Sequence, residues 1–132
     1  NWATCDTFAP KIFLKYPEET LAYVQKWLAS ADTYTVRYGI GILLSNYLDA
    51  HFSPVHLQWV TAISSSEYYI NMMIAWYLAT ALAKQYEATL PYLEAKTLAP
   101  FVQNKSIQKA RESKRITPEI KEYLLTLKVQ KS

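Results

Sequence analysis

The chain has 132 residues, of which 51% are hydrophobic and 14% aromatic, so it is long enough to build one domain with a sizeable core. It contains only two glycines, whereas an all-β chain of this length would need many more turn residues, so an all-α fold is predicted. The net charge of +3 divides into −2 over residues 1–100 and +5 over residues 101–132, which indicates an anionic partner, most commonly nucleic acid, unless the basic end is only a solvated pair of helices.

The first signals along the chain are prolines and acidic residues. Residues 1–15 have the pattern of a helix interrupted at Pro10. Pro17 is followed by two glutamates, and proline with acidic residues is typical of the first turn of a helix. The sequence therefore predicts a second helix, which begins at Pro17 and ends near Ser30.

The third predicted helix covers about 33–49, and Asp32 precedes it as a candidate N-cap. This helix contains Gly39 and Gly41, each of which costs about 1 kcal/mol relative to alanine in a helix interior. Two such residues are expected where another backbone packs very close.

Proline also marks the later helices, at Pro54, Pro91 and Pro118, each expected in a first turn. The predicted ranges are 54–64, 66–85, a short helix from Pro91 to Lys96, 100–113 and 118–128. The sequence thus predicts seven or eight helices in antiparallel pairs and no sheet.

The stretch from Ser64 to Ala83 is the most apolar in the chain. Ser64 and Glu67 have the spacing of a capping box. The residues after Glu67 are apolar or aromatic on nearly every side, so this helix is expected at the centre of a helical pack. Its uncharged run is shorter than the about 20 residues that a membrane span needs, and no membrane partner is expected.

A weak internal repeat relates three of these helices. The stretch around Arg37 aligns with that around Met72 and, less closely, with that around Lys105, at offsets of 35 and 33 residues; Asn71 and Asn104 also match. Such a period with two helices per repeat is typical of an α-solenoid, in which the second helix of each pair lines the concave face.

Several reactive residue types are predicted to be structural. His51 and His56 have no nearby cysteine or suitably spaced acid, so no metal site is expected. Trp27 and Trp59 are assigned to the core. The only cysteine, Cys5, excludes an internal disulfide, suits a cytoplasmic protein, and is interpreted as packed rather than nucleophilic.

Four segments resemble the AlkD-like family of bacterial DNA alkylation repair proteins, which are built from HEAT-like helical repeats. These segments read NWATCD, WLASADTYTVRYGIGILL, YYINMMIAWYL and NKSIQKARES. The resemblance covers essentially all of residues 1–132 but begins partway into the family's pattern. It therefore implies a single HEAT-like repeat domain that is the C-terminal part of a longer chain.

The resemblance implies a monofunctional DNA glycosylase, which hydrolyses the N-glycosidic bond of cationic N3- or N7-alkylated purines in duplex DNA without a metal or other cofactor. It also implies a monomeric cytoplasmic protein. Asp6 matches the family's catalytic aspartate, Trp2 its catalytic tryptophan and Trp76 its second cleft tryptophan. Arg37 matches a phosphate-binding arginine.

Further DNA contacts are expected from the basic C-terminal third. Lys105 is supported by the repeat, and Lys109 is a general basic candidate, as are Arg111, Lys114 and Arg115. Two positions depart from the family's pattern, since Ala79 and Met72 stand where relatives often carry basic residues. Weaker DNA binding by the central repeat is the expected consequence.

The residues suit the implied chemistry but leave other interpretations open. An alkylpurine cation is already a good leaving group, so the main need is a carboxylate such as Asp6 beside the positive charge that develops on the sugar. Alternatively, Asp6 is an ordinary helix-face residue, the tryptophans are core, and Arg37 pairs with Asp32. The chain is then a non-catalytic DNA-binding relative or a protein-binding helical scaffold.

Overall fold

The computed structural model describes residues 17–130, and within them every regular element is a helix. The helices are α3 (Pro17–Leu28), α4 (Thr33–Asn46), α5 (Pro54–Thr61), α6 (Tyr68–Lys84), α7 (Tyr86–Glu94), α8 (Pro100–Arg111) and α9 (Pro118–Leu125). The all-α prediction is confirmed for this part of the chain. The helix predicted over residues 1–15 lies outside the described residues.

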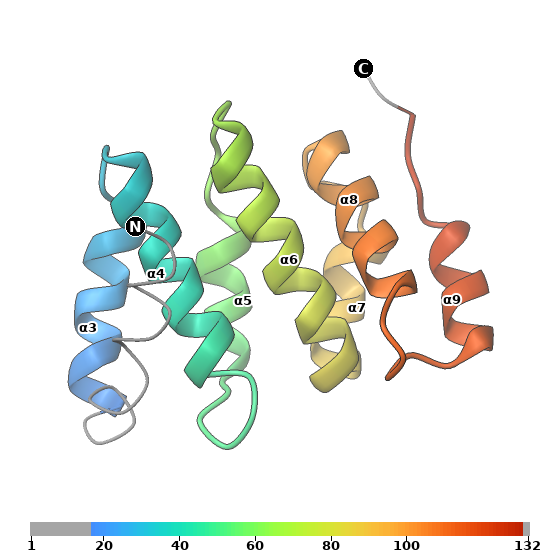
Figure 1. Cartoon of the computed structure of the whole chain (residues 1–132), viewed down its shortest axis with the longest axis horizontal. Coiled ribbons are helices and arrows are strands. Elements are labelled where there is room, and N and C mark those ends of the chain that lie inside the picture. The colour runs from blue at the N-terminus through green and yellow to red at the C-terminus, as the bar shows by residue number, and fades with distance from the viewer. Residues whose placement is uncertain (1–16, 131–132) are drawn as a thin grey trace.

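The helices form two layers along the long axis of the molecule (Figure 1). Helices α4, α6 and α8 lie side by side in the front layer and all run downward in this view, while α5 and α7 return upward behind them. Helix α3 packs against α4 at one end, and α9 packs against α8 at the other. The three helices that the sequence repeat aligns therefore share one face of the molecule.

Two of the predicted helix starts are made as expected. The Asp32 carboxylate accepts hydrogen bonds from the Thr35 hydroxyl at 2.6 Å and the Thr35 backbone N–H at 2.9 Å, and these two bonds lower the pKa of Asp32. The Thr117 hydroxyl oxygen accepts from the Ile120 N–H, with Pro118 in the first turn of α9. Both caps satisfy N–H groups that a helix start leaves unpaired.

The predicted capping box of Ser64 and Glu67 is wrong. Helix α6 begins at Tyr68 with Glu67 as its N-cap, and no side chain caps it. The serine hydroxyl that takes part is that of Ser65, which accepts from the Glu67 N–H in the preceding turn at 3.0 Å. Asn71 secures the same turn by donating its side-chain N–H to the Ser65 carbonyl at 2.9 Å.

The predicted position of Pro91 in a first turn is also wrong, because α7 begins earlier, at Tyr86. Proline inside a helix leaves the carbonyl four residues earlier without its partner, here that of Glu87. Pro91 and Glu87 are both exposed, so water can bond to that carbonyl. The cost of the internal proline is reduced accordingly.

Helix α6 connects the two hydrophobic cores of the described residues. Ile74 and Leu78 belong to the first core, with residues of α4 and α5, whereas Leu82 belongs to the second, with residues of α8 and α9. The central position of this helix is confirmed. Burial on all sides is not, since Tyr68, Tyr69 and Trp76 are 56%, 60% and 55% exposed. Neighbouring helices cover its flanks and back, and its front face remains open.

The two glycines of α4 do allow close packing, but against side chains rather than a backbone. A Cβ atom on Gly39 would lie 3.0 Å from Leu28 Cδ2 and 3.2 Å from Trp27 Cβ, both in α3. A Cβ atom on Gly41 would meet only the terminal methyl of Met73 in α6, at 3.3 Å. The contact at Gly39 is the more rigid, because the Cβ atom of Trp27 is fixed to the backbone of α3.

We predict that Gly41→Ala stabilises the protein by up to about 1 kcal/mol, because alanine favours the helix and the flexible Met73 side chain can move. Gly39→Ala should instead destabilise it by about 1–3 kcal/mol through overpacking against α3. Urea denaturation of the two variants measures both effects. Equal stabilisation by both substitutions would contradict the assignment of the tight contact to Gly39.

The predicted structural role of His56 agrees with its surroundings. Its ring is buried, with centroids 5.5 Å from Tyr47 and 5.0 Å from Trp59. Burial lowers the pKa of His56 below the ordinary value of 6.5, although a backbone hydrogen bond at Tyr47 partly opposes the shift. Trp27 and Trp59, which were assigned to the core, are half-buried at its edge.

A pH dependence of stability follows from His56. Above pH 6.5 the imidazole is neutral in both the folded and the unfolded protein, so it contributes no pH dependence to the stability. As the pH falls below 6.5, the unfolded chain takes up a proton that the folded protein does not, so stability falls until the lower, folded-state pKa is reached. We predict that His56→Gln flattens the decline in melting temperature between about pH 7 and 5.5. His51→Gln, which changes an exposed histidine, should keep the decline in melting temperature. If His51→Gln flattened the decline instead, the assignment of the pH dependence to His56 would be wrong.

Candidate nucleic-acid interface

A row of aromatic and cationic side chains crosses α4, α6 and α8. The Arg37 guanidinium lies over the ring of Tyr69, 5.1 Å from its centroid. The ring of Tyr69 meets that of Tyr68 edge-on at 5.3 Å, and Tyr68 contacts Phe101 at 5.6 Å. The Lys105 ammonium completes the row, 5.8 Å from the centroid of Phe101. We call these five residues the aromatic row.

The ends of the aromatic row are the two cations that the internal repeat aligns. Arg37 is on α4 and Lys105 on α8, with the third repeat-related residue, Met72, half-buried on α6 between them. Each cation lies near the face of an aromatic ring, whose negative charge attracts it. Lys105 also donates to Gln108 Oε1 at 3.1 Å. The Asp32 carboxylate, the alternative partner considered for Arg37, is bonded to Thr35.

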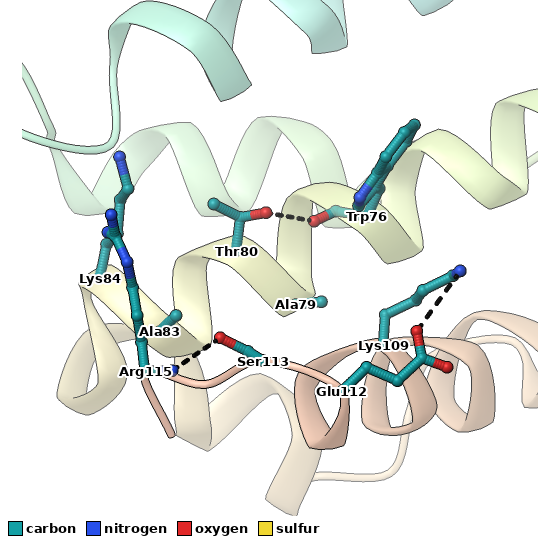
Figure 2. Close-up of a pocket in the computed structure, with 9 residues that line it drawn as sticks. All are labelled: Trp76, Ala79, Thr80, Ala83, Lys84, Lys109, Glu112, Ser113 and Arg115. Carbon is teal, nitrogen blue, oxygen red and sulfur yellow. Dashed lines mark hydrogen bonds and ion pairs between the residues drawn. The ribbon is translucent and has the colours of Figure 1, made fainter. Parts of the chain in front are cut away.

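A pocket of about 560 Å³ lies between the C-terminal halves of α6 and α8 (Figure 2). Trp76 and Lys109 border it toward the right of the view, and Lys84 and Arg115 toward the left. Its complete lining is Trp76, Ala79, Thr80, Ala83, Lys84, Lys109, Glu112, Ser113 and Arg115. Two predicted site residues from different helices, Trp76 and Lys109, therefore share one pocket.

Ion pairs reduce the positive charge that two of the three pocket cations present. Lys84 is 2.9 Å from the Asp49 carboxylate, and Lys109 is 3.7 Å from Glu112. Both pairs are partly exposed and therefore weak, so an anionic ligand can compete for the lysines. Arg115 is exposed, and its backbone N–H donates a hydrogen bond to the Ser113 hydroxyl oxygen at 3.2 Å.

The chemical character of the pocket suits an electron-poor or phosphorylated ligand. The exposed Trp76 indole offers a π face for a cationic base, and three basic side chains can bind phosphate oxygens. Ala79, one of the two departures from the family's pattern, is buried at the pocket. Alanine there brings no charge, so the cations at this site come from Lys84, α8 and the segment after it.

The other predicted catalytic residues, Trp2 and Asp6, lie outside the described residues. Their roles in catalysis stay predictions. Within residues 17–130, no group of three or more His, Cys, Asp and Glu side chains is arranged to hold a metal ion. No helix in the same part of the chain is long and apolar enough to cross a bilayer.

Sequence reasoning missed the aromatic members of the row, Tyr68, Tyr69 and Phe101, and the pocket residue Lys84. A signal for Tyr69 was present: it is three residues before Met72 and seven before Trp76, a spacing that places all three on one face of a helix. The signal was hidden because the opposite face of α6 is equally apolar. Arg115 was only one of several general basic candidates.

Comparison with known families gives one match. The family model described as DNA alkylation repair enzyme matches residues 1–116, which include every predicted site residue. Comparison with the curated proteins and with the solved structures found no significant match. The resemblance seen in the sequence motifs is confirmed by the family model, and it indicates a role in DNA repair with DNA as the partner. The chain belongs to the DNA alkylation repair enzyme family.

Proposed function

We propose that this protein is a DNA glycosylase that removes cationic N3- or N7-alkylated purines from duplex DNA. The observation that carries the proposal is the exposed indole of Trp76 in a pocket bordered by Lys109 and Arg115, in a member of a DNA alkylation repair family. A large aromatic side chain left exposed beside basic side chains serves no core packing and suits contact with an alkylated nucleotide.

In the proposed reaction, the bond between the purine nitrogen and C1′ of the deoxyribose breaks, and the bonding electrons neutralise the departing base. The positive charge moves to the sugar as an oxocarbenium ion, which water then attacks at C1′ with loss of a proton. Asp6 stabilises this charge and orients the water, while Trp2 and Trp76 contact the cationic nucleotide. The products are a neutral alkylpurine and an abasic site.

The DNA backbone is assigned to the basic side chains. Arg37 and Lys105 lie on the front-layer helices α4 and α8, at equivalent positions of two repeats, and Lys109 lies one turn further along α8. Such contacts bind phosphates and carry no sequence information, so binding should be independent of sequence and weaken with salt. The weak central repeat, with Met72 and Ala79, should limit the affinity.

The wider architecture belongs to the same proposal. We infer that the two-layered row of helices is a HEAT-like α-solenoid, and that residues 1–132 form a single domain. The protein is proposed to act as a cytoplasmic monomer. The alternation of helix direction and the repeat of α4, α6 and α8 on one face support the solenoid.

Asp6→Asn should abolish most excision while leaving DNA binding intact. The substitution keeps the size and removes the negative charge, and loss of one well-placed electrostatic group costs about 10²–10³ in rate. Binding to duplex should hold or rise slightly, because the carboxylate lies near a polyanion. Release of 7-methylguanine from methylated duplex measures the rate, and gel mobility shift measures binding.

The matched control is Asp32→Asn, which makes the same chemical change at an exposed helix cap that asparagine fills as well. It should excise at the wild-type rate. An Asp6→Asn variant with near wild-type excision would remove Asp6 from the mechanism. A wild-type protein that binds duplex without excision would be a non-catalytic relative, and one that does neither would fit a protein-binding scaffold.

Arg37→Ala should weaken binding to damaged and undamaged duplex by the same factor and reduce the slope of log affinity against log salt by about 1, as expected of one phosphate contact. Lys26→Ala removes a charge from α3, outside both the aromatic row and the pocket, and should change neither quantity. Fluorescence anisotropy across a salt series gives both. A loss confined to damaged DNA would give Arg37 a role other than phosphate binding.

A further inference from the structure

The aromatic row contains more than a duplex-binding surface requires. Tyr68 and Tyr69 are each more than half exposed, and neither belongs to a hydrophobic core. Their rings form a continuous chain of contacts with Phe101, and a cation lies over the ring at each end. Exposed neighbouring aromatic rings of this kind mark a binding surface rather than a packing one.

Duplex phosphates do not account for the rings. The cations at the two ends can bind phosphates, but an aromatic ring gains little from a phosphate group. In a duplex the faces of the bases are already stacked on one another, so the tyrosines have no base face to contact. Unpaired bases present those faces freely, and stacking of a base on an aromatic side chain is favourable for every base.

We propose that the aromatic row binds unpaired nucleotides of single-stranded DNA. Bases stack on Tyr69 and Tyr68, and Arg37 and Lys105 hold phosphates at the two ends. The Arg37 guanidinium lies 5.1 Å from the centroid of the Tyr69 ring, while 60% of the tyrosine surface stays exposed and open to a base. This activity goes beyond excision from duplex and does not depend on Asp6 or on the pocket.

The charge pattern favours a nucleic acid strand over a protein partner. The row presents a cation at both ends, and none of its five residues is acidic. A strand in which phosphates flank its bases matches a run of rings with a cation at each end, and such rings and cations are the elements of surfaces that bind single strands without regard to sequence. The row therefore fits single-stranded DNA better than an apolar peptide.

The test compares the affinity of the protein for a labelled thymidine oligonucleotide of about 12 nucleotides and for a duplex of the same length, by fluorescence anisotropy. Tyr69→Leu should weaken single-strand binding about 5- to 100-fold and duplex binding less than about 2-fold, because the stacking ring is lost while the phosphate-binding cations Arg37 and Lys105 are kept. Tyr69→Phe keeps the ring and should retain single-strand affinity within about 2-fold.

Tyr23→Leu is the matched control, since Tyr23 is a similarly exposed tyrosine, at 58%, on α3 outside the row. It should leave both affinities unchanged, and circular dichroism confirms that each variant is folded. Equal losses for single strand and duplex with Tyr69→Leu would overturn the proposal, as would the absence of measurable single-strand binding by the wild type.

Excision from methylated duplex, measured on the same variants, separates this proposal from the glycosylase assignment. Wild-type protein that binds single strands through Tyr69 but releases no alkylpurine would refute the proposed glycosylase activity and support single-strand binding by the aromatic row. Tyr69→Leu that excises at the wild-type rate while losing single-strand affinity would support the row as a separate site. If the wild type excises alkylpurines and Tyr69→Leu leaves the single-strand affinity unchanged, the proposed single-strand binding by the aromatic row is overturned and the glycosylase proposal stands.

Discussion

The packing of α6 is the constraint on which the rest of the structure depends. Its buried side chains enter both hydrophobic cores, and each large apolar side chain fully buried contributes about 1.5–3 kcal/mol. Because α4 and α8 pack along its two flanks, only its front face is left for Tyr69 and Trp76. The helix that holds the domain together therefore also presents the rings of both candidate sites.

Side-chain amides at repeat-related positions hold the non-helical segments beside this layer. Asn71 binds the turn before α6 through the Ser65 carbonyl, and Asn104 on α8 binds Val129 after α9 with both its N–H and its carbonyl oxygen, at 2.7 and 2.9 Å. Buried Gln103 donates to the Leu93 and Leu127 carbonyls. These bonds secure α8 against its neighbours and so fix the position of its lysines.

The family assignment and the geometry address different parts of function. The family match points to repair of alkylated DNA, whereas the open face of α4, α6 and α8 offers two chemically distinct sites. In the pocket, one indole stands among cations that are partly neutralised by Asp49 and Glu112. In the aromatic row, rings connect two cations. A protein that searches DNA for damage can use both, since one suits a single altered base and the other an unpaired strand.

Among the described residues, the sequence by itself indicated the helices and their order, although not the start of α7, because proline, acidic residues and caps such as Asp32 act locally. The sequence repeat also placed Arg37 and Lys105 at equivalent positions. It also supplied the family. Only the tertiary structure decided which side of α6 faces solvent, since that helix is apolar all round and its period gives no direction. The pairing of Trp76 with Lys109 and of Arg37 with Tyr69 likewise arises between helices far apart in the sequence, where local signals carry no information.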